Sequence, residues 1–157
     1  MTREEKFMYE AISMGIEGMR NNLGGPFGCV IVKDDKIIGK GCNSVIAMSD
    51  PTAHAEIIAI RDACTHLQAF QLHDCEVYTT CEPCPMCMGA LYWARPKKIY
   101  YANSRTDAAN IGFDDSFIYE ELALPVEERK IAMECLHNEE ATKMFEEWKM
   151  MNNRTLY

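Results

Sequence analysis

The sequence predicts an α/β protein in which a mixed β-sheet carries helices on both of its faces. The expected elements follow in the order helix, hairpin, helix, strand, helix, strand. The two successive strand–helix–strand units are typical of parallel strands joined by crossovers. A chain of 157 residues suits one hydrophobic core, and no repeat, low-complexity tract or linker divides it. We therefore expect a single domain over residues 1–157.

The first helix and the hairpin are predicted from local signals. Thr2 and Glu5 have the spacing of a capping box, and apolar residues follow at helical spacing until Gly24-Gly25-Pro26. We expect this helix to cover one face of the sheet. Two segments rich in β-forming residues, 29–33 and 36–42, then flank an Asp-Asp pair and predict a hairpin.

The middle of the chain predicts two helices that alternate with two strands. Residues 50–52 read Asp-Pro-Thr, which offers a cap and a first-turn proline for a helix that continues over 53–67. Residues 75–81 alternate as a strand. Two prolines open a third helix within 83–94, and a strand over 97–102 follows it.

The tail of the chain has a weaker pattern. A polar stretch runs to Asp115 and is followed by the apolar residues 116–119 and a break at Pro125. Residues 139–151 predict a last helix.

Charge and cysteine content exclude several classes of protein. Sixteen Lys and Arg against 24 Asp and Glu give a net charge of −8, which repels phosphate backbones, so we expect no nucleic-acid partner. No run approaches the about 20 apolar residues of a membrane span, and we expect no membrane partner. Charged residues occupy the positions where a signal peptide needs an apolar run, which predicts a cytoplasmic protein. Its eight cysteines are then expected to be thiols, some of them metal ligands.

Two short motifs carry the predicted chemistry. His54-Ala55-Glu56 stands at the predicted start of one helix, and Cys84 and Cys87 stand at the start of the next. Each motif alone is weak, because a lone histidine is usually structural and a single C-x-x-C can be a redox pair. Together they match the zinc-deaminase signature, in which His and two Cys bind Zn²⁺ and the Glu is not a ligand.

Helix geometry allows these residues to meet. Cys84 and Cys87 are three residues apart and share one helix face, and a helix N-terminus favours thiolates. His54 and Glu56 are two residues apart, so they can share a pocket only if their helix points at it end-on.

Cys81 leaves two alternatives open. If Cys81 were a fourth ligand, the zinc site would be closed and structural. If only His54, Cys84 and Cys87 bind, one position remains for a water whose pKa falls toward about 7. We favour three ligands and one zinc per chain, because Glu56 has a role only when there is a water to deprotonate.

Several longer stretches of the chain resemble the cytidine-deaminase superfamily and, within it, the small bacterial guanine deaminases. These stretches are GGPFG (24–28), DPTAHAE (50–56), CEPCPMC (81–87), YWARP (92–96) and TDAANIGFDDSFIY (106–119). The resemblance implies a three-layer α/β/α fold with a mixed five-stranded sheet and a zinc-activated water. It also implies a homodimer in which a C-terminal segment is exchanged between subunits.

The resemblance also implies a role for individual residues. Glu56 is expected to be the proton shuttle. Asn43 and Asp115 are expected to hydrogen-bond a purine base, and Phe27 to pack against it. The pocket is further expected to include Ala55 and, as part of a lid, Tyr157.

The implied reaction is hydrolysis of guanine to xanthine and ammonia. The alternatives are a deaminase of guanosine, cytosine or tRNA adenosine, or a noncatalytic zinc-stabilised interaction module. The acidic composition disfavours the tRNA alternative, and Glu56 disfavours the noncatalytic one.

Overall fold

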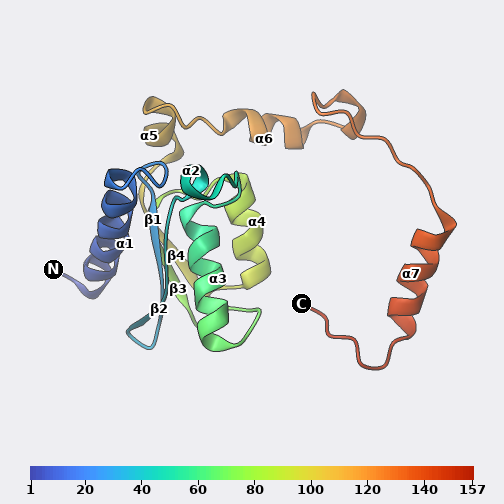
Figure 1. Ribbon diagram of the computed structural model, residues 1–157, viewed down its shortest axis with the longest axis horizontal. Helices are drawn as coiled ribbons and strands as arrows, with labels where there is room; N and C mark the ends of the chain where they lie inside the picture. The colour runs from blue at the N-terminus through green and yellow to red at the C-terminus, as the bar shows by residue number, and fades with distance from the viewer. The chain divides into compact units, whose positions relative to one another are not determined.

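A computed structural model describes all residues from 1 to 157 and divides the chain into two compact units, residues 1–115 and residues 116–157. The first unit contains four strands and the helices that cover them (Figure 1). Its elements are α1 (Arg3–Arg20), β1 (Gly28–Lys33), β2 (Lys36–Cys42), α2 (Val45–Met48), α3 (Ala55–Leu67), β3 (Glu76–Cys81), α4 (Pro85–Ala94), β4 (Lys98–Asn103) and α5 (Arg105–Asn110).

The sheet is mixed, as predicted, with the strand order β2-β1-β3-β4. Strand β1 is antiparallel to both β2 and β3, and β3 is parallel to β4. Both predicted crossovers therefore join strands that run in the same direction. Only the second crossover joins neighbours, because β1 lies between β2 and β3.

The expectation of a fifth strand is wrong, since the sheet has four strands. The apolar residues 116–119 in the tail form the start of α6 (Ser116–Ala123). Their sequence SFIY continues with Glu, Glu, Leu and Ala, which are good helix formers. Strand β4 is consequently an edge strand of the sheet.

Helices cover both faces of the sheet, as predicted (Figure 1). The side chains of β1 alternate between two layers of core. Cys29 and Ile31 face a cluster with α3 and α4, whereas Val30 and Val32 face a cluster with Ala11 of α1. This alternation follows from the two-residue period of a strand and explains why β1 is apolar from Cys29 to Val32.

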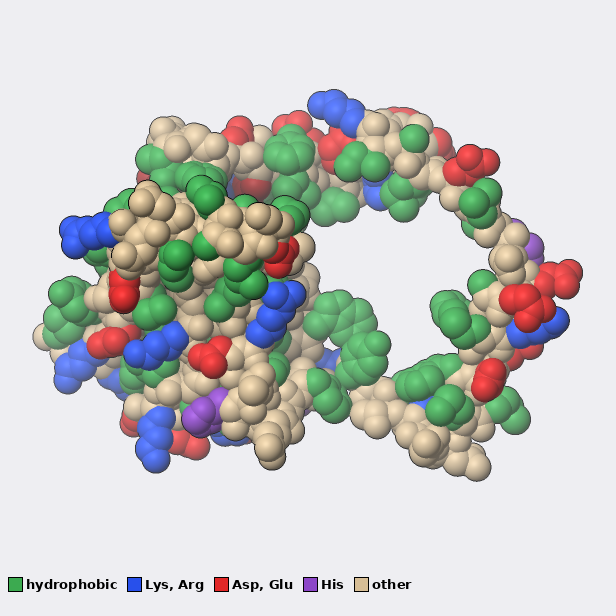
Figure 2. Space-filling view, in the orientation of Figure 1, with side chains coloured by type: hydrophobic (Ala, Val, Ile, Leu, Met, Phe, Trp, Pro, Cys, Tyr) green, Lys and Arg blue, Asp and Glu red, His purple; other side chains and the backbone are tan.

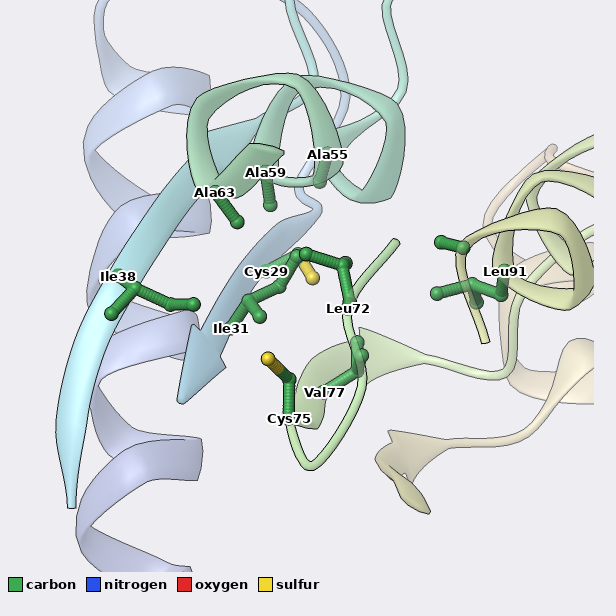
Figure 3. Packing of buried hydrophobic residues seen from close by; sticks show 11 residues of the cluster. Cys29, Ile31, Ile38, Ala55, Ala59, Ala63, Leu72, Cys75, Val77 and Leu91 are labelled. Carbon is green, nitrogen blue, oxygen red and sulfur yellow. The ribbon is translucent and has the colours of Figure 1, made fainter. Parts of the chain in front are cut away.

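Helix α3 lies very close to β2. Figure 3 shows Ala55, Ala59 and Ala63 turned toward the buried side chains of the sheet. A Cβ atom at Gly39 would lie 2.7 Å from Cβ of Ala63, and one at Gly41 would lie 2.7 Å from the nitrogen of Ala59. Small residues on both elements therefore permit an approach that fixes the N-terminus of α3.

Local signals correctly predicted the first helix and the hairpin. The capping box of α1 is formed, with Thr2 Oγ1 3.2 Å from the Glu5 nitrogen and Glu5 Oε2 2.6 Å from the Thr2 nitrogen. Asp34 and Asp35 both have positive φ angles, 48° and 60°, as a type I′ hairpin turn requires.

The start of α3 differs from the prediction, because α3 begins at Ala55 and not at Pro51. Asp50 caps a turn instead, since its Oδ1 accepts hydrogen bonds from the nitrogen and hydroxyl of Thr52 at 2.8 and 2.7 Å. His54 is therefore the N-cap residue of α3.

Residues 116–157 contain α6, the short 3₁₀ helix η1 (Val126–Glu128) and α7 (Glu139–Met150). The last helix was predicted, and its N-cap Asn138 accepts a hydrogen bond from the Glu140 nitrogen at 2.8 Å. No residue of this unit is buried, and most of its side chains are exposed. None of the helices in either unit is both long enough and apolar enough to cross a bilayer.

Candidate active site

The candidate metal ligands lie at the N-termini of two helices. His54 is the N-cap of α3 and Cys84 is the N-cap of α4, and both have extended backbone angles. Neither side chain caps its own helix, so both are available as ligands. Cys87 lies one turn into α4, and Pro85 fills the first helical position, where its missing N–H costs no helix bond.

The three ligand atoms lie at distances that suit zinc. Nδ1 of His54 is 3.6 Å from Sγ of Cys84 and 3.5 Å from Sγ of Cys87, and all three atoms lie within 4.8 Å of one another. Tetrahedral zinc bonds of about 2.3 Å to sulfur and about 2.0–2.1 Å to nitrogen would separate S and N by about 3.6 Å. The residue types and the spacing therefore fit a zinc ion.

The electrostatics of the site favour a cation. Hydrogen bonds from Cys87 and His54 lower the pKa of Cys84 to about 4, and the helix N-terminus also favours a thiolate there. The hydrogen bond to Cys84 raises the pKa of His54. The neighbouring sulfur of Cys84, together with burial and Glu56, raises the pKa of Cys87. A divalent cation among these atoms would stabilise both thiolates at once.

Glu56 lies beside the three ligands without being one of them. It occupies the first turn of α3, and its side chain is buried, with 6% of its surface exposed. Its Oε1 accepts a hydrogen bond of 2.7 Å from the hydroxyl of Thr79, and its Oε2 lies 3.4 Å from Sγ of Cys87. His54 and Glu56 therefore both contact Cys87, as their positions at the start of one helix allow.

Cys81 does not join the group of three ligands. It ends β3, and its thiol donates to the carbonyl oxygen of Ser104 at 3.6 Å. Burial raises its pKa to about 11, which disfavours the thiolate that zinc binds. This placement supports the three-ligand alternative.

Asn43 and Phe27 are hydrogen-bonded to each other at the glycine-rich loop, residues 24–28. Oδ1 of Asn43 accepts hydrogen bonds from the nitrogens of Gly25 and Val45, at 3.2 and 3.3 Å. The Asn43 nitrogen also donates to the carbonyl of Phe27 at 3.0 Å. The Phe27 ring packs edge-on against Phe113, with the ring centroids 5.0 Å apart. The side-chain carbonyl of Asn43 thus holds the loop, and its amide nitrogen remains as a possible donor to a ligand.

Asp115 is half-buried and interacts electrostatically with the metal site. Burial raises its pKa, Arg105 lowers it, and the negative charge of Cys84 raises it further. Of the three candidate ligands, Cys84 is the one whose charge acts on Asp115, and the hydrogen bond of Asp115 to a base stays a prediction.

The remaining two predicted residues have different surroundings. The side chain of Ala55 is completely buried in the core, so only its backbone could contact a ligand. Tyr157 belongs to the unit 116–157 and is exposed. Its role as a lid stays a prediction.

Sequence reasoning missed two residues near the site. Thr79 is a polar residue on the core-facing side of a buried strand. A polar residue in such a position indicates a buried hydrogen-bond partner. Phe113 lies within the quoted GFDDSF stretch, but nothing in its sequence context indicates that it packs against Phe27.

Comparison with known proteins identifies the family. The protein-family model described as the cytidine and deoxycytidylate deaminase zinc-binding region matches residues 1–103 of this chain. A guanine deaminase from Bacillus subtilis is 52% identical over 153 residues, 98% of each chain, and an X-ray structure of guanine deaminase from that organism superimposes with a TM-score of 0.94 over 98% of each chain.

Two further relatives are more distant. A tRNA-specific adenosine deaminase from Aquifex aeolicus is 38% identical over 130 residues, 82% of this chain and 83% of its own. A structure of guanine deaminase from Nitrosomonas europaea has a TM-score of 0.65 and 29% identity, and covers 69% of this chain and 63% of its own. With its zinc-compatible ligand set and its cytidine-deaminase-like α/β fold, the chain belongs to the family of zinc-binding cytidine and deoxycytidylate deaminases.

Proposed function

We propose that this protein is a zinc-dependent hydrolase that converts guanine to xanthine and ammonia. The observation that carries the proposal is the buried, nonligating carboxylate of Glu56 beside a His/Cys/Cys group of zinc geometry. The 52% identity to a guanine deaminase over 98% of both chains supports guanine as the substrate. A noncatalytic zinc module would have no use for a carboxylate in this position.

In this proposal, Nδ1 of His54 and the sulfurs of Cys84 and Cys87 hold one zinc ion. When bound, zinc supplies a Lewis acid that lowers the pKa of a water toward about 7 and makes it a nucleophile. The two helix N-termini favour the deprotonated sulfurs. Cys81, whose thiol donates a hydrogen bond to the carbonyl of Ser104, would not be among the ligands.

Glu56 moves the protons of the reaction. It accepts a proton from the attacking water as the new C–O bond forms at C2 of guanine, and gives that proton to a ring nitrogen. It then takes the remaining proton from the new hydroxyl on C2 and delivers it to the amino group, so that the C2=O bond forms as the C2–N bond breaks and ammonia leaves. A positioned acid–base group of this kind contributes about 10²–10⁴-fold to the rate.

Donor and acceptor chemistry favours guanine over other bases. The N1–H and 2-amino groups of guanine are both donors, and the carboxylate of Asp115 only accepts. Adenine would present a bare ring nitrogen to that charge. The amide nitrogen of Asn43 and the backbone of Ala55 are further groups that could hold the base, with Phe27 as its apolar wall.

The test is ammonia release from guanine, guanosine, adenine, cytosine, cytidine and an adenosine-containing tRNA substrate. We expect guanine to have the highest kcat/KM. The tRNA is included because an adenosine deaminase of tRNA is among the relatives. A Cys84→Ser protein, prepared identically, controls for contaminating enzymes. Faster release from cytosine or tRNA than from guanine would contradict the substrate assignment.

We further propose that residues 1–157 form one functional domain that is completed in a homodimer by exchange of the C-terminal segment. Figure 2 shows hydrophobic side chains on the surface of the unit 116–157. Ile131, Leu136, Phe145 and Leu156 are 72–83% exposed, and a segment of this kind is stabilised only by burial against another surface. The edge strand β4 also needs a cover. Light scattering should give twice the chain mass, and a monomeric mass would contradict the proposal.

We also propose that the protein is located in the cytoplasm. All eight cysteines are free thiols. Free thiols and a thiolate metal site are typical of a reducing compartment.

A further inference from the structure

Thr79 carries a buried hydroxyl beside the apolar core. It lies in the central strand β3, where it pairs with Cys29 of β1 and Tyr101 of β4. Its strand neighbour two residues earlier, Val77, packs in the core beneath α3 and α4. Only 1% of Thr79 is exposed, so its hydroxyl would be costly there without a hydrogen-bond partner.

The partner of this hydroxyl is Glu56. Oγ1 of Thr79 donates to Oε1 of Glu56 at 2.7 Å, inside the protein. The other hydrogen bond that the carboxylate accepts comes from the thiol of Cys87, at 3.4 Å to Oε2. That thiol loses its proton when it binds a metal. The bond from Thr79 then remains as the one that orients the carboxylate.

We propose that Thr79 is a positioning residue for Glu56, an inference that rests on the proposed role of Glu56 as proton shuttle. The β-branched side chain of Thr79 has restricted rotation, and its strand is held on both sides. It therefore offers a donor of fixed direction. By holding Oε1, it leaves Oε2 facing the metal group. It also keeps Glu56 from turning to become a zinc ligand itself, which a carboxylate otherwise can be.

The test compares two substitutions at Thr79 in the zinc-loaded protein. Thr79→Val removes the donor and keeps the shape, whereas Thr79→Ser keeps the donor. We expect Thr79→Val to lower kcat for guanine about 10–100-fold, the effect typical of partners that orient groups at a metal site. KM and zinc content should change little, and Thr79→Ser should retain most of the activity.

Thr80→Val is the matched control. Thr80 is the next residue of β3, and its buried hydroxyl accepts a hydrogen bond from the Gly28 nitrogen at 3.0 Å instead of bonding Glu56. This control removes a buried hydroxyl from the same strand, so its thermal midpoint should fall like that of Thr79→Val, while its kcat should stay near wild type.

Glu56→Gln separates this inference from the proposed function. If Thr79 acts through Glu56, Thr79→Val should add little loss in the Glu56→Gln background. A wild-type rate for Thr79→Val, equal losses for Val and Ser, loss of zinc in Thr79→Val, or a fully additive double variant would each overturn the positioning role. A wild-type rate for Glu56→Gln would instead overturn the proposed function.

Discussion

In residues 1–115 the apolar side chains of two layers are enclosed between a sheet and its helices, whereas in residues 116–157 no side chain is fully buried. The first unit also contains the three candidate ligands and Glu56. The second contributes only Tyr157 to the predicted site. Since burial of apolar surface stabilises a fold by about 25 cal/mol per Å², the first unit can hold its own geometry. The second has no buried side chains of its own to stabilise it in this way, which is why we propose that it is exchanged with a second copy.

Within the first unit, the proton shuttle should be removable without loss of the metal, because Glu56 is not one of the three candidate ligands. Glu56→Gln should keep the zinc and the fold, because glutamine retains an oxygen that can accept the bond from Thr79. It should lower kcat by about 10²–10⁴-fold, the contribution of general acid–base transfer. Steady-state kinetics with metal analysis test this. Turnover near the wild-type rate, or loss of metal with the charge, would exclude the proton shuttle.

Asp115, the last residue of the first unit, should control substrate binding. Asp115→Ala removes the proposed acceptor of two hydrogen bonds from guanine, each worth about 1.5–3 kcal/mol when one partner is charged. We therefore expect kcat/KM for guanine to fall roughly 10²-fold or more, with full zinc content. Asp114→Ala, at the neighbouring position, is the comparison variant. Equal losses for both variants would indicate a loop effect and not recognition by Asp115.

The tight packing of the first unit can be tested at Gly41. A Cβ atom there would collide with the backbone of Ala55 and Ala59, so Gly41→Ala should lower the free energy of unfolding by about 1–3 kcal/mol. Gly89→Ala in α4 is the control. A Cβ atom at Gly89 meets nothing within 4 Å, and alanine should stabilise that helix by up to about 1 kcal/mol. Denaturant unfolding of both variants measures the difference.

The second unit should affect kinetics but not the metal. Removing residues 153–157 deletes Tyr157, and we expect KM for guanine to rise or kcat to fall several-fold. Zinc content and the thermal midpoint should stay near wild type, because residues 153–157 are all exposed and none of them is a candidate ligand. Unaltered kinetics would exclude a lid.

The smallest effect is expected at Cys81. Serine in its place can still donate to the carbonyl of Ser104, and the thiol is not one of the three ligands. Cys81→Ser should therefore retain one zinc per chain and activity within about twofold. Metal analysis decides the question, because loss of zinc would mean that Cys81 is a fourth ligand.

Much of the first unit was predictable because its signals are local. The capping box at Thr2 and the hairpin at Asp34 and Asp35 depend only on residues close in sequence. The start of α3 was placed wrongly, since Asp50 can cap a turn as well as a helix. The fifth strand was implied by the resemblance and not by any segment of this sequence, and the sheet contains only the four strands that the local patterns predicted.

The chemistry of the site was largely a property of the sequence. His54, Glu56, Cys84 and Cys87 carry a signature in which residue type and spacing already specify metal ligands and a separate acid–base group. Helix-start positions also implied that the ligands could converge, because a first turn allows residues two apart to face one pocket. These inferences needed no contact between distant segments.

Only the tertiary structure decided how the site is held. The hydrogen bond from Thr79 to Glu56 joins residues 23 positions apart, and the ring contact of Phe27 with Phe113 joins the glycine-rich loop to the end of the first unit. The approach of α3 to Gly39 and Gly41 likewise depends on the strand order. A local pattern specifies what a residue can do, but its partner is set by how the sheet and helices pack, because packing alone brings distant side chains to hydrogen-bonding distance.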